Sequence, residues 1–246
     1  MALVPLEIQA GVYRNGTDLQ SQNRWRDASL VRWTEGTLRP IGGWEQKSQT
    51  AAASKIRALI AWVDNSNARR FVAGTHEKLY AYSQSGVQAD ITPAGFTTGR
   101  VDASAFTGYG AGSYNAGYYG TARPDNATIL EATSWALDTF GENLVACSAD
   151  DGKLYEWTLN NSTPAAVISN APTNNVGLVV TEERFLFALG AAGNPRRVQW
   201  CDKENNTQWT PSATNEAGDL DLQTSGEIMC GMNVRGQTLI LTTTDA

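Results

Sequence analysis

The chain has 246 residues, of which 41% are hydrophobic and 18% are charged, and this apolar content excludes a wholly disordered protein. A net charge of −6 argues against a protein that grips nucleic acid through a basic surface, because such affinity comes from neutralising phosphates. Frequent glycine (23 residues), with many Asn, Thr and Ser, indicates a chain that often reverses direction, which is typical of an all-β fold.

Residues 1–47 differ from the rest of the chain in charge and in pattern. They carry a net charge of +1, whereas residues 48–246 carry −7. Short apolar pairs and several turn signals without a sustained period predict an extended N-terminal arm that lies along other surfaces. We expect its aromatic and basic residues to form a subunit interface: Arg24, Trp25, Arg32, Trp33, Arg39 and Trp44.

The interleaved Arg and Trp residues of the arm also suit direct stacking on DNA. The nearly balanced charge of the arm and the acidity of residues 48–246 disfavour that reading. We therefore expect the Trp rings to fill pockets and the Arg side chains to pair with Asp27, with Glu35 or with acidic groups of a neighbour.

One unit of short apolar runs recurs from residue 55 onward. Each run has about 5–8 residues, is rich in Val, Leu, Thr and aromatics, and is bounded by Gly, Asn or Asp, which are strand signals. The successive units contain KIRALIAWVD, RRFVAGT and KLYAYS; then TSWALDTF, NLVACSA and KLYEWTL; then NVGLVVTEE, RFLFALGA and RRVQWCD; and finally EIMCGMNV and TLILTTT.

The spacing of these units predicts a β-propeller-like repeat of antiparallel blades over residues 48–246. Phe71, Leu144, Phe185 and Leu239 are assigned the same place in each unit. The intervals are 42 residues, once residues 96–126 are removed from the first, then 41 and 54. A period of about 40–50 residues with short strands is typical of propeller blades. A β-sandwich built from the same hairpins is the alternative fold. Three blades and two strands do not close a ring, so we expect either a fragment of a longer protein or completion by other chains.

Residues 96–126 form a Gly/Tyr-rich insertion between two of these units. The segment is poor in aliphatic side chains, so it cannot form a core of its own. A long flexible loop is one reading, and a loop that contacts a neighbouring subunit or lines a channel is the other. In the second reading the contacts come from its tyrosines, which are Tyr109, Tyr114, Tyr118 and Tyr119.

The stretch SADDGKLY fits an Asp-box-like turn, Ser-x-Asp-x-Gly-x-x-aromatic, formed here by Ser148, Asp150, Gly152 and Tyr155. We expect a hairpin between two outer strands of a blade, in which Asp150 accepts backbone N–H groups of the turn. Gly152 should adopt a conformation that a Cβ would forbid, and Tyr155 should pack beneath. The role of the motif is structural.

No residue pattern for catalysis, metal binding or cofactor binding stands out. The single histidine, His76, lies at a predicted hairpin tip, where we expect it to be exposed, and the cysteines Cys147, Cys201 and Cys230 lack metal-ligand spacing. Paired carboxylates suit glycoside hydrolysis, but we expect the pairs here to be solvated: Asp150 with Asp151, Glu182 with Glu183, and Asp219 with Asp221. We therefore predict no enzyme and no cofactor. No apolar run is long enough to insert into a membrane.

The stretches GVYRNGTDLQSQNRWRDASLVRWTEGTLRPIGGW and LGAAGNPRRVQWCDKENNTQWTPSATNEAGDLDLQTSG resemble virion proteins of tailed bacteriophages. The order of arm and blades is similar to that of podophage tail nozzle or tail hub proteins, including the packaged-DNA stabilisation proteins. Residues 38–43, Leu-Arg-Pro-Ile-Gly-Gly, match the short element that leads into their propeller blades. The chain departs from the family in being much shorter.

The resemblance implies a virion protein, made in the bacterial cytoplasm, that forms a homo-oligomeric ring of six subunits in the phage tail. Its partners would be adaptor and portal proteins and tail fibre or needle proteins. The ring would retain packaged DNA and conduct it at ejection, with non-specific passage of DNA along an acidic lumen. Two alternatives are a phage neck or tail collar protein that docks fibres, and a carbohydrate-active or carbohydrate-binding propeller.

Overall fold

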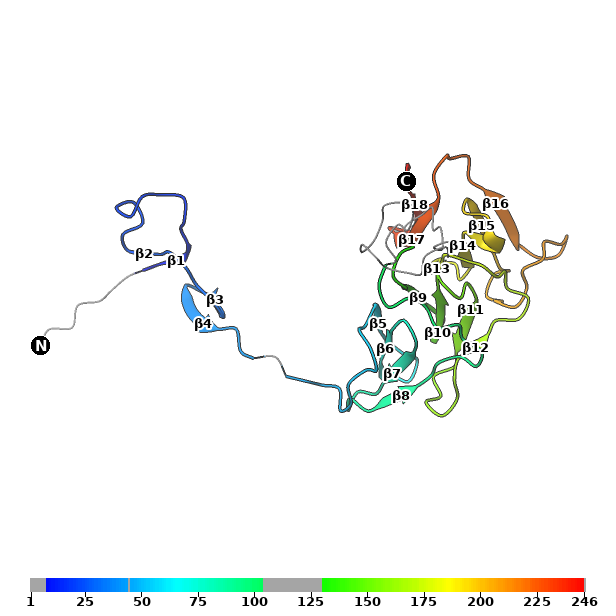
Figure 1. Ribbon diagram of the computed structural model, residues 1–246, viewed down its shortest axis with the longest axis horizontal. Helices are drawn as coiled ribbons and strands as arrows, with labels where there is room; N and C mark the ends of the chain where they lie inside the picture. Colours follow the sequence, from blue (N-terminus) through cyan, green and yellow to red (C-terminus); the bar gives the residue numbers. More distant parts are fainter. Residues whose placement is uncertain (1–7, 44, 104–129, 246) are drawn as a thin grey trace, which may run out of the picture. The chain divides into compact units, whose positions relative to one another are not determined.

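The computed structural model describes residues 8–43, 45–103 and 130–245, and the chain divides into two units, Met1–Lys47 and Ser48–Ala246. We call the first unit the arm and the second the body (Figure 1). Within the described residues the regular structure is β-strand apart from one short 3-10 turn, η1 (Ala191–Gly193), so the predicted all-β class is confirmed.

The arm contains two small two-stranded sheets. In one the strands are parallel and in the other they form an antiparallel hairpin. The hairpin turn consists of Glu35 and Gly36, whose φ angles of 51° and 76° are those that a two-residue turn of the hairpin-favoured kind needs. The bounds are β1 (Gln9–Val12), β2 (Arg24–Trp25), β3 (Val31–Thr34) and β4 (Thr37–Pro40).

The body is built from three four-stranded antiparallel sheets and a hairpin, and within each sheet the strands follow one another in chain order. The predicted apolar runs coincide with the first three strands of each sheet and with both strands of the hairpin, whereas the fourth strand of each sheet lies outside them. The first sheet contains β5 (Ala58–Val63), β6 (Arg69–Gly74), β7 (Leu79–Tyr82) and β8 (Gln88–Asp90). The second sheet contains β9 (Trp135–Phe140), β10 (Asn143–Ser148), β11 (Leu154–Trp157) and β12 (Ala166–Val167). The third sheet contains β13 (Gly177–Val180), β14 (Leu186–Leu189), β15 (Arg197–Trp200) and β16 (Gly218–Asp221), and the C-terminal hairpin contains β17 (Ile228–Val234) and β18 (Gln237–Thr242).

The second sheet is buried on both faces because alternate residues of each strand point to opposite sides. On β10, Leu144 and Ala146 pack into a first core shared with the first sheet. Val145 and Cys147, which lie between them in sequence, pack into a second core shared with the third sheet. These apolar runs therefore fill two cores at once, and the body is a row of sheets that cover one another.

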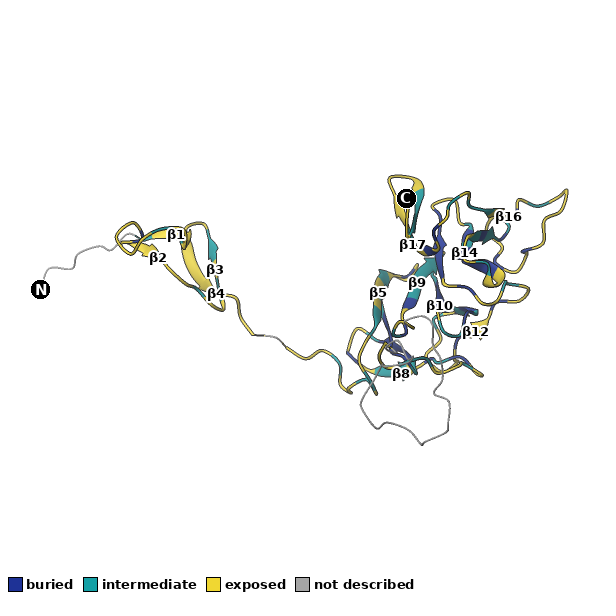
Figure 2. Ribbon diagram, turned by 45° about the horizontal axis from the view of Figure 1, so that its top comes forward, coloured by how far each residue is buried: buried dark blue, intermediate teal, exposed yellow. Residues whose placement is uncertain are grey.

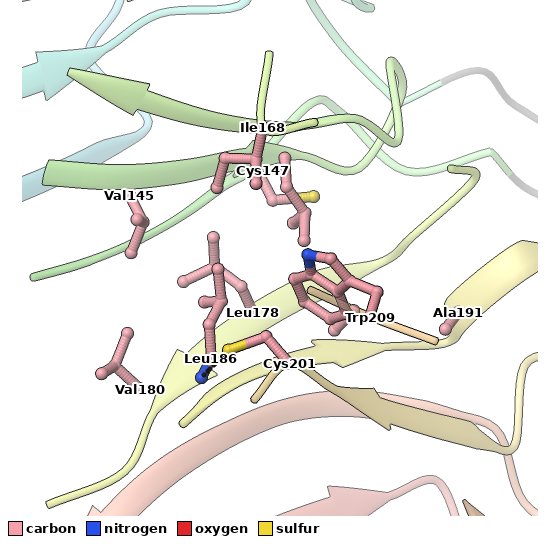
Figure 3. Close-up of a cluster of buried hydrophobic side chains, with 11 residues drawn as sticks. Val145, Cys147, Ile168, Leu178, Val180, Leu186, Ala191, Cys201 and Trp209 are labelled. Carbon is pink, nitrogen blue, oxygen red and sulfur yellow. Dashed lines mark hydrogen bonds between the residues drawn. The ribbon is translucent and has the colours of Figure 1, made fainter. Parts of the chain in front are cut away.

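The second core lies between the second and third sheets (Figure 3). Trp209 is 1% exposed and closes one end of it, with its indole N–H donating to the C=O of Asn206 at 2.6 Å. The other buried residues of this core are Val145, Cys147, Leu154, Ile168, Leu178, Val180, Leu186, Ala188, Ala191 and Cys201.

The first strands of successive units lie against one another, with β5 beside β9, β9 beside β13, and β13 beside β17. Figure 1 shows the sheets following one another in this order. A third, smaller core joins the third sheet to the C-terminal hairpin and includes Val179, Leu189, Val198 and Ile228. Burial falls off towards the C-terminal hairpin, where Met229, Met232 and Val234 are 48%, 52% and 42% exposed (Figure 2).

The packing of the cores shows that the repeat position assigned to Phe185 is wrong by one residue. Phe71 faces away from the second sheet and Leu144 faces the first sheet, so the two residues lie on the same face of their sheets. On β14 the residue on that face is Leu186, whereas Phe185 lies before the strand. The reason is the loop before β14, in which Phe185 closes a turn by donating its N–H to the Oγ1 of Thr181 at 3.1 Å. The interval from Leu144 to Leu186 is then 42 residues.

A second one-residue correction applies to the C-terminal hairpin. Both β9–β10 and β17–β18 are closed by two-residue turns, with Phe140 opposite Asn143 and Val234 opposite Gln237. The residue after Gln237 is Thr238, so Thr238 rather than Leu239 is equivalent to Leu144.

Candidate assembly site

The arm has almost no interior of its own. Among its described residues, 8–43 and 45–47, the only buried residue is Ser21, which is 6% exposed. Three large aliphatic residues are instead open to solvent: Leu19 is 80%, Leu30 is 76% and Ile41 is 58% exposed. A segment without an apolar core gains little from folding alone, so this surface is the strongest candidate for contact with another protein.

The structure places the predicted interface residues in both small sheets of the arm. Arg24 lies over the ring of Tyr13 at 5.3 Å, and Trp25 is on β2 with its C=O accepting the N–H of Tyr13 at 2.8 Å. Arg32 and Arg39 lie opposite each other across β3 and β4. The remaining two are Trp33, which lies opposite Leu38 on the same hairpin, and Trp44, which lies outside the described residues.

The ion pairs of the arm differ from those expected. Asp27 pairs with Arg14 at 2.8 Å, and Arg26 pairs with Asp18 at 2.7 Å. Within the described part of the chain Arg32 and Arg39 form no ion pair. Both guanidinium groups of the hairpin therefore remain available to carboxylates of a partner.

The Asp-box-like turn joins β10 to β11, which are the two central strands of the second sheet rather than outer strands. Gly152 has a φ of 67°, as expected, and a Cβ there would lie 2.6 Å from the Cα of Asn174. Tyr155 is fully buried beneath the turn, and the Oγ of Ser148 is buried without a hydrogen-bond partner. The turn is thus packed against the loop that leads to the third sheet.

Asp150 does not cap its own turn, which corrects the expectation from the sequence. Its carboxylate forms an ion pair with Arg100, accepts the backbone N–H of Arg100 at 3.3 Å, and accepts the hydroxyl of Thr133. The Asp150 side chain is only 9% exposed. It therefore fastens two distant segments to the turn.

Asp151 forms the complementary half of this polar cluster and is also buried, with a side chain 1% exposed. It accepts the N–H of Thr97 and the ammonium of Lys153, each at 3.1 Å, and the hydroxyl of Tyr155. Burial alone would raise the pKa of the Asp151 carboxyl, but these hydrogen bonds outweigh it and lower the pKa below its usual range. The expectation that this carboxylate pair is solvated was wrong, and its contacts account for a structural role.

The other two carboxylate pairs do not gather into a site. Asp219 and Asp221 lie on β16 rather than in a loop, and Asp221 pairs with Arg197 at 2.8 Å. Glu182 and Glu183 are exposed residues of the loop before β14.

His76 is buried, at 8% exposed, and not solvent-exposed as its place in a tight turn suggests. Its C=O accepts the N–H of Gly99 at 2.8 Å, so a segment distant in sequence covers the turn. Phe96, at the start of the predicted insertion, stacks on Trp135 with ring centroids 5.1 Å apart. The insertion therefore begins with packed residues, and Tyr109, Tyr114, Tyr118 and Tyr119 lie outside the described residues.

A hollow of about 540 Å³ lies along the first strands β9, β13 and β17. Asp138 lines it and accepts the N–H of Val180 at 2.8 Å, while the amide of Asn233 donates to the C=O of Val180. Burial raises the pKa of Asp138, although hydrogen bonds from the N–H groups of Val180 and Thr139 oppose the shift. Asp138 and Asn233 thus satisfy the backbone N–H and C=O of Val180 at the free edge of β13.

Within residues 8–43, 45–103 and 130–245, no cluster of His, Cys, Asp or Glu has the composition of a metal site. The same residues contain no helix long and apolar enough to cross a membrane. Neither a protein-family model, nor a curated protein, nor a solved structure matches the chain.

Proposed function

We propose that the chain is a structural protein of a bacteriophage tail, of the nozzle or hub kind, whose copies assemble into a ring. The observation that carries the proposal is the arm, which exposes Leu19, Leu30 and Ile41 and buries no apolar side chain in its described residues. Burial of these side chains against a partner would offset the conformational entropy that the arm loses on becoming ordered. The arm therefore suits an assembly contact.

The arrangement of the body supports a propeller-like reading of the repeats. Each four-stranded sheet corresponds to a blade, successive sheets share cores, and their first strands adjoin in order. In this reading β5, β9, β13 and β17 are the inner strands and the sheets form an open arc of blades. Assembly places such arcs around a common axis.

Charge supports passage of DNA without binding. The body carries a net charge of −7, and an acidic lumen repels phosphates, so a duplex slides past rather than sticking. Six subunits, adaptor and portal proteins above and fibre or needle proteins below are the partners that this role implies. The polar clusters at Asp150 and Asp151 are tied into ion pairs and hydrogen bonds within the body, which fits a structural role better than a catalytic one.

The test is the mass of the full-length protein in solution, measured by light scattering after size exclusion and by native mass spectrometry. We expect a closed oligomer whose mass is a small multiple of 26.5 kDa. Replacing Leu19, Leu30 and Ile41 together by Ser should dissociate it, whereas Val167→Ser, an exposed valine of β12, should not. An unsubstituted chain that is monomeric at tens of micromolar, or an oligomer that persists unchanged with the three arm substitutions, would overturn the proposal.

A further inference from the structure

The C-terminal hairpin is half of the unit that the body repeats. The first three sheets each contain four strands, whereas β17 and β18 form a two-stranded sheet. Within the described residues β17 is the sole strand that pairs with β18. The outer edge of β18 therefore occupies the position at which the other sheets continue with a third and a fourth strand.

The first strand of the arm hairpin has a sequence similar to that of the third strand of the first and second sheets. Residues 30–34 of the arm read Leu-Val-Arg-Trp-Thr. Residues 154–158, which include β11, the third strand of the second sheet, read Leu-Tyr-Glu-Trp-Thr. Residues 79–83 of the first sheet read Leu-Tyr-Ala-Tyr-Ser. The shared pattern is a leucine, an aromatic residue three positions later, and then Thr or Ser. Because strand residues alternate between faces, this pattern places the leucine and the aromatic ring on opposite faces.

The backbone of the hairpin matches as well. In the second sheet the third and fourth strands are closed by a hydrogen bond from the N–H of Ile168 to the C=O of Leu154, at 2.9 Å. In the arm, the N–H of Ile41 donates to the C=O of Leu30, also at 2.9 Å. The first sheet has the same bond, at the same length, between Ile91 and Leu79. The arm hairpin β3–β4 is therefore equivalent in sequence and in pairing to strands three and four of a sheet.

The equivalent residues differ greatly in burial. Leu154 and Ile168 are 0% and 4% exposed in the second core, whereas Leu30 and Ile41 are 76% and 58% exposed. The arm hairpin thus presents to solvent the two side chains that a complete sheet buries. In the second sheet these two side chains face the third sheet. In a hairpin added beside β18, Leu30 and Ile41 would therefore lie on the face turned away from the third sheet, while Trp33, the equivalent of Trp157, would lie on the face turned toward it.

The surface beside β18 is hollowed and partly apolar. A hollow of about 530 Å³ is lined by Thr238, Leu239 and Ile240 of β18 and by Leu222, which follows β16. On the adjoining face of the third sheet, Leu220 is 56% exposed, although its equivalents in the first and second sheets, Ile91 and Ile168, are buried. Two further strands beside β18 would cover this face, as Tyr155 and Trp157 of β11 pack on the corresponding face of the first sheet.

We propose that the β3–β4 hairpin of one copy adds to the β18 edge of a second copy as the third and fourth strands of its C-terminal sheet. The inference rests on the proposed function, which supplies the neighbouring copies. Each copy carries one donor hairpin and one acceptor edge, so the contact is head to tail and generates a ring when its rotation closes. Main-chain hydrogen bonds supply affinity, and Leu30 and Trp33 supply specificity on opposite faces.

The register follows from the equivalences already given. Glu156 lies opposite Val145 in the second sheet, and the equivalent residues are Arg32 of the arm and Leu239 of β18. Arg32 should therefore lie opposite Leu239 of the neighbour. Arg39 lies opposite Arg32 on the far side of the hairpin, one strand further from β18. Strands are spaced about 4.8 Å apart, so a cysteine at 39 should lie about 10 Å from one at 239.

The experiment mixes two full-length chains, both carrying Cys230→Ser to remove the exposed native thiol. One chain carries Arg32→Cys and the other Leu239→Cys, and the mixture is oxidised with copper phenanthroline and run on a non-reducing gel. We expect a heterodimer band that dithiothreitol removes, at least fivefold stronger than with Arg39→Cys in place of Arg32→Cys. Two separate chains form this band only through an intermolecular contact.

The outcomes separate this inference from the proposed function. An oligomer by light scattering without the Arg32–Leu239 link, or with the Arg39 link as strong, leaves the ring standing and overturns the strand donation. A link found only when both cysteines are on one chain shows that the arm closes its own sheet, and also overturns it. A monomer by light scattering removes the proposed function as well.

Discussion

The β11–β12 pair of the second sheet and the β3–β4 hairpin of the arm have nearly the same local sequence and pairing but opposite surroundings. Leu154 is fully buried between two sheets, whereas Leu30 is 76% exposed. Strand formation in both follows from β-branched and aromatic residues with suitable turns, which are local properties. Burial depends on which other sheet lies alongside, so the contrast separates what a segment encodes from what its neighbours provide.

The largest expected difference between the two hairpins comes from removing the equivalent leucine. Leu154→Ala should lower the free energy of unfolding of the full chain by about 2–5 kcal/mol, because it leaves a cavity in a closed core. Leu30→Ala should change it by less than about 0.5 kcal/mol at dilutions where copies are separate, because no packing is lost. Urea unfolding followed by tryptophan fluorescence measures both. Equal losses from the two substitutions would contradict the contrast.

A second difference is expected at the two glycine turns. Gly152→Ala should destabilise the body by about 2–4 kcal/mol, because the positive φ is unfavourable and the new Cβ meets the backbone of Asn174. Gly36 also has a positive φ, of 76°, but a Cβ there meets nothing within 4 Å. Gly36→Ala should therefore cost about 1–2 kcal/mol and act on the arm hairpin alone.

Urea unfolding reports the first of these effects, and amide hydrogen exchange of residues 31–40 reports the second. Equal losses of stability from Gly152→Ala and Gly36→Ala would contradict the prediction. They would show that the turn at Gly152 moves away from Asn174 to accommodate the new Cβ.

Local pattern was enough to predict the first three strands of each sheet and the C-terminal hairpin, because their apolar runs and bounding turns are contained in the sequence. The short fourth strands β8, β12 and β16 were not predicted, because they contain no apolar run. Errors arose where a distant segment decides the outcome. His76 was expected to be exposed, but the segment at Gly99 covers it, and Asp150 bonds to Arg100 rather than to its own turn. Phe185 was assigned the place of Leu186, because an apolar run does not reveal where the loop ends and the strand begins.

The candidate assembly site was predicted only in part, because exposure of a side chain also depends on segments distant in sequence. Arg and Trp drew attention to the arm, but Leu30 and Ile41 did not stand out, since single aliphatic residues give no sign of exposure. The alignment of residues 30–34 with 154–158 is present in the sequence. Its meaning depends on pairing and burial, which require the structure.

A third prediction uses acidity to probe the buried cluster of the body. Asp151→Asn should cost about 1.5–3 kcal/mol at pH 7, because charge-assisted hydrogen bonds from Tyr155 and Lys153 are lost. Since the folded pKa of Asp151 lies below the unfolded value near 3.8, its contribution is present above about pH 4. It is lost as the pH falls through the folded pKa, so wild type and variant should converge in stability at low pH.

The matched control for this prediction is Asp102→Asn, whose side chain is 76% exposed and which should change stability by less than about 0.5 kcal/mol. Urea unfolding at pH 7, 5 and 3 gives the comparison. A gap between wild type and Asp151→Asn that stays constant or widens on acidification would contradict the assigned direction of the pKa shift.

The smallest expected effect contrasts two ion pairs. In the arm, Arg14 and Asp27 are 66% and 75% exposed, so solvent and salt screen their attraction, and a double-mutant cycle should give about 0.2–1 kcal/mol. In the body, Asp150 is 9% exposed beside Arg100 and also accepts the hydroxyl of Thr133, so its coupling should be larger and should persist in salt. Hydrogen exchange of the arm and urea unfolding of the body, each at 0.05 and 0.5 M NaCl, measure the two couplings. If salt weakened both couplings equally, the Asp150–Arg100 pair would be as open to solvent as the Arg14–Asp27 pair, and the contrast between the body and the arm would be wrong.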